Sequence, residues 1–138
     1  MNRILSLLVA LLFAATLCEG QRTTVIVEIV NGRNNKPIRD RSVNVWLGDG
    51  GMRLLDTDPK GEIRLDVADI QPFKIRVNLN SRVDCRLQPG FRVEYSLDEI
   101  LTKGLIGENA CGKAVRVPAP GILVIYARPR TFWESFMI

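Results

Sequence analysis

The side chains that could carry out chemistry are few in this sequence. None of the 138 residues is a histidine. Histidine is the usual base beside serine and cysteine nucleophiles and a frequent zinc ligand, so histidine-dependent sites of both kinds are excluded. Neighbouring carboxylates, such as Asp66 and Asp69, are close only in sequence, which does not establish a pair for acid–base catalysis. We therefore predict that the protein is not an enzyme and has neither catalytic residues nor a cofactor.

Residues 56–62 resemble the start of a calcium-binding loop, with two carboxylates two positions apart and Gly61 at the sixth place. A cation, Lys60, nevertheless occupies a ligand position, and Val67 stands where such a loop requires a glutamate. The proline and glycine of segment 58–61 are typical of a β-turn. We predict a turn here and no metal site.

The N-terminus has the order of a secretory signal peptide. A single arginine precedes an apolar run over residues 4–17, and the small residue Gly20 follows it. The run of about fourteen residues is shorter than the roughly twenty that a membrane-spanning helix needs. We predict that residues 1–20 are a signal peptide and that the exported protein, periplasmic or extracellular, begins at Gln21. Cleavage before Cys18, with a lipid attached to that cysteine, is the alternative.

Two cysteines would remain after export, Cys85 and Cys111. In an oxidising compartment such a pair is more often a structural disulfide than two free thiols. Closing a loop of this length would stabilise the fold by roughly 3 to 4 kcal/mol. We therefore predict a disulfide bond between Cys85 and Cys111.

The charge of the chain indicates no nucleic-acid partner. The formal net charge is +4, and removal of residues 1–20 takes away one arginine and one glutamate and so leaves it unchanged. Positive and negative side chains alternate along the chain, whereas a nucleic-acid footprint requires a basic stripe on one face. A solvated surface of mixed charge is the simpler interpretation.

The elements that would position these side chains are mainly short strands. Apolar and polar residues alternate with a period of two, which is typical of strands with one buried face. The predicted strands of this kind are 22–31, 43–47, 53–57, 63–67 and 73–79. Because a turn separates the third from the fourth, we predict that these two form a hairpin. Residues 122–127 form a continuous apolar run and are predicted to be the central strand, covered on both faces.

One short helix is predicted over residues 96–104. Ser96 and Glu99 form a capping box at its start, and Gly104 is typical of its end. Its apolar side chains are expected to face the sandwich edge near the disulfide. Together these elements predict one domain over residues 21–138, an all-β sandwich of immunoglobulin-like form with one short helix.

Four pieces of segment 23–77 share a pattern with a known family. They are the strand that ends in Asn31-Gly32, the residues Lys36-Pro37-Ile38, the strand 43–47 and the Thr-Asp-Pro-Lys-Gly-Glu of residues 57–62. This pattern resembles the carboxypeptidase regulatory-like, or transthyretin-like, β-sandwich family. The second half of the chain looks like an elaboration found in small exported bacterial proteins of this kind. The resemblance implies a binding or structural role rather than a catalytic one.

Four aromatic residues are candidates for a contact surface: Trp46, Phe132, Trp133 and Phe136. Alternation places Trp46 opposite the apolar side chains of its strand, either on an exposed face or beneath a second layer. The other three stand in the C-terminal segment, after two arginines, where they would meet a partner or a membrane surface. The alternative is that they fold back over the domain itself.

We predict an exported, non-catalytic module with a binding or structural role in the cell envelope, whose partner is a protein or a carbohydrate. A small hydrolase on the same scaffold, or a lipid-anchored envelope protein, is the alternative.

Overall fold

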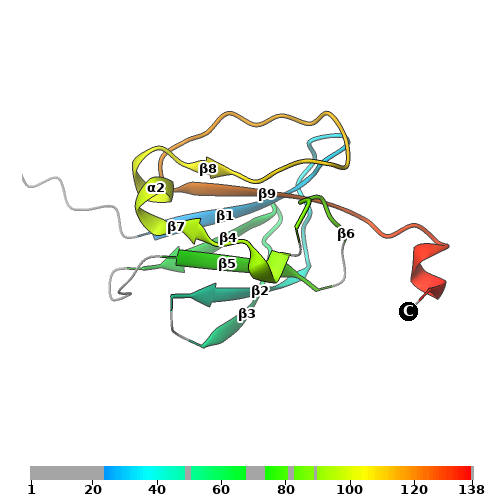
Figure 1. Cartoon of the computed structure of the whole chain (residues 1–138), viewed down its shortest axis with the longest axis horizontal. Coiled ribbons are helices and arrows are strands. Elements are labelled where there is room, and N and C mark those ends of the chain that lie inside the picture. Colours follow the sequence, from blue (N-terminus) through cyan, green and yellow to red (C-terminus); the bar gives the residue numbers. More distant parts are fainter. Residues whose placement is uncertain (1–23, 49–50, 68–73, 81–82, 89, 138) are drawn as a thin grey trace, which may run out of the picture.

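A computed structural model describes residues 24–48, 51–67, 74–80, 83–88 and 90–137 (Figure 1). The predicted signal peptide lies outside these residues. The described chain folds into two β-sheets that pack face to face, which confirms the predicted all-β sandwich. A single α-helix, α2 (Leu97–Thr102), and two turns of 3-10 helix, η1 (Gly90–Arg92) and η2 (Glu134–Phe136), complete the described elements.

The first sheet has the strand order β4-β1-β9-β6, with β8 also paired to β9. Its strands are β1 (Thr24–Asn31), β4 (Glu62–Asp66), β6 (Val83–Asp84), β8 (Leu105–Ile106) and β9 (Ile122–Arg128). The second sheet has the order β3-β2-β5-β7. Its strands are β2 (Ser42–Leu47), β3 (Met52–Asp56), β5 (Lys74–Leu79) and β7 (Tyr95–Ser96). Most pairings are antiparallel, but β9 runs parallel to β1 and to β8.

The core between the sheets follows from the alternation of side chains. In β1, Val25, Val27 and Ile29 point inward and are at most 1% exposed. In β2, Val43 and Val45 meet them from the second sheet. Such burial removes apolar area from water at roughly 25 cal/mol per Å² and is the main term that stabilises the sandwich.

Strand β9 is central and covered on both faces, as its continuous apolar run predicts. Leu123 and Ile125 lie in the core between the sheets. Val124 and Tyr126 lie on the opposite face, in a second apolar cluster with Cys85. The segment after β8 covers this face, since the hydroxyl of Tyr126 accepts the backbone N–H of Arg116 at 2.9 Å.

The predicted hairpin of residues 53–57 and 63–67 is wrong. The turn forms, because the Asp58 carboxylate accepts the N–H groups of Lys60 and Glu62 at 2.8 and 2.9 Å. Its two strands, however, enter different sheets: β3 pairs with β2, and β4 pairs with β1. The chain crosses between sheets at Gly61, whose carbonyl accepts the N–H of Ile29 at 2.8 Å.

Helix α2 forms within the predicted segment 96–104, with Ser96 as its N-cap. The hydroxyl of Ser96 accepts the N–H of Glu99 at 3.4 Å. Gly104 follows the helix with a φ of +79°, a conformation that glycine adopts without strain. Contrary to the prediction, the apolar side chains of the helix do not face a sandwich edge near the disulfide. Leu97 and Ile100 pack into the core between the sheets, whereas the disulfide belongs to the second cluster.

Candidate contact surface

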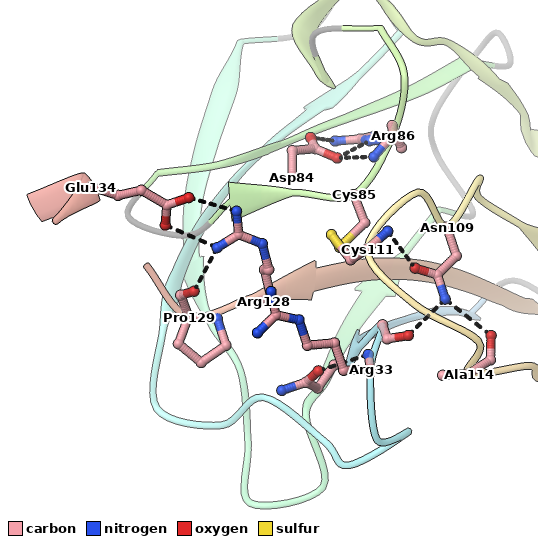
Figure 2. Close-up of a disulfide and its surroundings, with 12 residues drawn as sticks. Arg33, Asp84, Cys85, Arg86, Asn109, Cys111, Ala114, Arg128, Pro129 and Glu134 are labelled. Carbon is pink, nitrogen blue, oxygen red and sulfur yellow. Dashed lines mark hydrogen bonds and ion pairs between the residues drawn. A yellow bond between two sulfur atoms is a disulfide. The ribbon is translucent and has the colours of Figure 1, made fainter. Parts of the chain in front are cut away.

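The C-terminal segment leaves the sandwich where β9 ends and is held there by one ion pair. The Glu134 carboxylate accepts two hydrogen bonds from the Arg128 guanidinium, at 2.6 and 2.9 Å (Figure 2). It also accepts the backbone N–H of Thr131 at 2.8 Å. The bonds from Arg128 first, and from Thr131 second, lower the pKa of Glu134 to about 2. Glu134 therefore fixes the start of η2 to the end of the central strand.

Beyond this ion pair, four apolar side chains form what we call the aromatic cluster: Phe132, Trp133, Phe136 and Met137. They are 68, 75, 70 and 80% exposed, respectively. The ring of Phe132 meets those of Trp133 and Phe136 edge-on, with centroids 5.6 and 4.7 Å apart. Figure 1 shows the segment, in red, beyond the end of the sandwich. The alternative in which these aromatics fold back over the domain is wrong.

Arginines surround the base of this segment. The N–H of Gly32 donates to the carbonyl of Ala127 at 2.9 Å, so Arg33 and Arg128 extend from adjacent pieces of chain (Figure 2). Arg33 and Arg130 are exposed and make no ion pair with any residue that the structure describes. The aromatic cluster and two uncompensated positive charges therefore lie at the same end of the molecule.

The fourth candidate, Trp46, lies elsewhere. It sits on the outer face of the second sheet, as alternation predicts, and is half-buried. The guanidinium carbon of Arg76, its cross-strand neighbour, lies 5.6 Å from the centre of the indole. Met52 and Leu54 on the same face are 51 and 60% exposed. The structure therefore does not bring Trp46 together with the aromatic cluster, and Arg76 lies over its ring.

The predicted disulfide is confirmed. The sulfur atoms of Cys85 and Cys111 are 2.10 Å apart, which joins the residue after β6 to the segment after β8. Beside it, the amide of Asn109 donates to the carbonyls of Gly32 and Ala114 at 2.9 and 3.0 Å (Figure 2). Its oxygen accepts the N–H of Cys111 at 3.2 Å. The disulfide is compatible with an oxidising compartment.

Sequence reasoning missed Arg86, the most buried charged group in the part of the chain that the structure describes, whose side chain is only 2% exposed. Its guanidinium donates to both oxygens of Asp84, at 2.8 and 2.5 Å. It also reaches the second sheet, where it donates to the carbonyl of Val77 at 2.7 Å and to the hydroxyl of Tyr95 at 3.2 Å. Alternation along residues 84–86 was the available signal, because it places the two charged side chains on one face.

The surroundings raise the pKa values of Arg86 and Tyr95 for different reasons. Burial by itself disfavours a charged guanidinium, but the bonds to Asp84 and Tyr95 outweigh it, and the pKa of Arg86 lies above its ordinary value. The pKa of Tyr95 is also raised, chiefly because burial disfavours the phenolate. Both side chains therefore keep their ordinary charge states, and we interpret the network as a brace between the sheets.

Within the described ranges, no group of three or more acidic or cysteine side chains is placed to hold a metal ion. No helix there is long and apolar enough to cross a membrane. Comparison with models of protein families, with curated proteins and with solved structures gives no match. A functional assignment therefore depends on the contacts of the chain itself.

Proposed function

We propose that the protein is an exported, non-catalytic module of the cell envelope that acts by binding, with the aromatic cluster as its contact surface. The observation that carries this proposal is the exposure of four large apolar side chains, each at least 68%, in a segment held by an ion pair. Exposed apolar side chains gathered in one place mark interaction sites in soluble proteins. Scattered single residues would carry no such meaning.

The fixed start of the segment favours binding over a passive tail. A free peptide would lose conformational entropy when it docks, and this loss weakens association. Here the pair between Arg128 and Glu134, together with the edge-on packing of the rings, removes part of that freedom before contact. The cluster is thus partly organised in the free protein.

Export is supported by the N-terminal pattern and by the disulfide between Cys85 and Cys111. The absence of histidine from the sequence supports a role without histidine-dependent catalysis. Membership of the transthyretin-like family remains part of this proposal, on the sequence pattern of residues 57–62 and the two-sheet architecture that it accompanies. A protein or a carbohydrate of the envelope is the partner that the family resemblance suggests.

The test is co-sedimentation of the purified exported protein with envelope fractions from the cells that produce it. We expect F132S/W133S/F136S to lose more than tenfold in bound protein, because it removes the three aromatic surfaces. The matched control is M52S/L54S, which removes two exposed apolar side chains from the outer face of the second sheet. Equal sedimentation of the aromatic variant and the wild type would remove the cluster from the proposal.

A further inference from the structure

We infer that the aromatic cluster enters the interface of an anionic phospholipid bilayer, with Arg33 and Arg130 against the lipid headgroups. This inference rests on the proposed function and names the partner of the same surface. Tryptophan is enriched at bilayer interfaces, where one side is apolar and the other is wet. Phenylalanine, with tryptophan, forms the apolar face of segments that insert there. The segment is one turn of 3-10 helix, so it would lie at the interface rather than span the bilayer.

The charges around the cluster are those that an anionic surface attracts. Glu134 is the one carboxylate between residues 128 and 137, and Arg128 neutralises it. Arg130 in the same segment and Arg33 beside it are exposed and unpaired among the described residues. Each basic side chain near an anionic leaflet strengthens binding by about fivefold, and apolar insertion with basic flanks gives reversible association.

The shape of the cluster favours a lipid interface over a protein groove. A helix that docks in a groove presents a single apolar stripe over at least two turns. Here the four side chains are confined to residues 132–137, which include only one turn of 3-10 helix, and each is exposed to a similar degree, between 68 and 80%. A segment this short cannot present such a stripe, whereas a bilayer interface accepts a small apolar group with basic flanks.

The test uses the purified exported protein, with its N-terminus first located by mass spectrometry, and vesicles of phosphatidylcholine with or without phosphatidylglycerol. The chain has two tryptophans, so W46F leaves Trp133 as the only indole and W133F leaves Trp46. With the anionic vesicles we expect the emission of Trp133 to shift to shorter wavelength and to be quenched by brominated acyl chains. The emission of Trp46, on the other sheet, should stay unchanged.

The arginines are tested with R33Q/R130Q, which should weaken binding to anionic vesicles by about twenty-five-fold if each arginine contributes about fivefold. The matched control is K103Q. Lys103 follows α2, near the start of β9, and is therefore at the other end of the strand from the cluster. Binding should also weaken as salt rises, since salt screens the attraction.

Each other outcome overturns the inference in a defined way. Equal binding to both kinds of vesicle would show that the protein does not require anionic lipid. An unchanged Trp133 emission with both kinds of vesicle would show that the aromatic cluster does not enter a bilayer. If the protein then still sediments with envelope fractions through its aromatic cluster, the partner is a protein or a carbohydrate, and the proposed function stands without the lipid.

Discussion

Two arginine–carboxylate pairs of the same chemistry occupy opposite environments in this molecule. Arg86 and Asp84 have side chains that are 2 and 21% exposed, whereas those of Arg128 and Glu134 are 16 and 31% exposed. Both guanidinium groups donate to both oxygens of their carboxylate. The buried pair has further partners on the second sheet, and the outer pair holds only the C-terminal segment. Position, not pair chemistry, therefore decides whether such a pair braces the fold or fixes a contact surface.

The largest effect should come from R86M. Methionine keeps much of the apolar length but leaves the Asp84 carboxylate without its charge partner and the Val77 carbonyl and Tyr95 hydroxyl without their donor. Breaking a buried pair on one side costs about 3 to 5 kcal/mol in the free energy of unfolding. Urea denaturation measures it. R128M is the matched control and should leave the urea midpoint unchanged, so equal losses in the two variants would contradict the distinction drawn here.

An intermediate loss in the free energy of unfolding is expected from G90A, which crowds the buried pair but keeps both of its side chains. A Cβ atom at Gly90 would collide with the Arg86 guanidinium, the Asp84 carboxylate and the backbone carbonyl of Val77. Overpacking of this kind costs about 1 to 3 kcal/mol. The control is G51A, because nothing lies within 4 Å of the Cβ that it would add. If thermal unfolding shows the same midpoint for both variants, the pair is not rigidly held.

What the sequence predicted correctly was local. Strand β1 is covered mainly on one face, so its apolar and polar residues alternate. Strand β9 is covered on both faces, so its apolar residues are continuous. Each pattern can be recognised within the strand itself. The hairpin failed because the turn at residues 58–61 has the same chemistry within one sheet or between two. The pairing of Ile29 with Gly61, distant in sequence, decides between them.

At the candidate site, too, local features were predictable and most contacts between distant residues were not. The aromatic residues of the C-terminal segment were identifiable from composition, but their exposure depends on Glu134 folding back to Arg128. The contacts of Arg86 with the second sheet join strands whose relative placement no local pattern encodes. The disulfide was predictable, because Cys85 and Cys111 are the two cysteines that remain after residue 20. The other partners across the fold were not.

The smallest effect on global stability, and the most direct on the contact surface, is expected from E134Q. Glutamine keeps the shape of the side chain and removes the charge that Arg128 and Thr131 bind. We expect the domain to unfold at the same urea concentration as the wild type. The backbone amides of the C-terminal segment should nevertheless show lower heteronuclear NOE values in NMR. E94Q, which loses a surface pair with Lys74, is the control and should leave these amides unchanged.

Acid should loosen the C-terminal segment of the wild type as E134Q does. The pH range of this effect follows from the pKa of Glu134. Arg128 and Thr131 lower it from the ordinary 4.5 to about 2 in the folded segment. A depressed pKa means that the carboxylate stabilises the folded segment fully above about pH 4.5 and loses this effect as pH falls through 2. The NOE values should therefore decline between these limits in the wild type and stay low throughout in E134Q. A segment equally ordered in both proteins at neutral pH would show that the ion pair does not fix the contact surface, and the outer pair would then be no more than a surface contact.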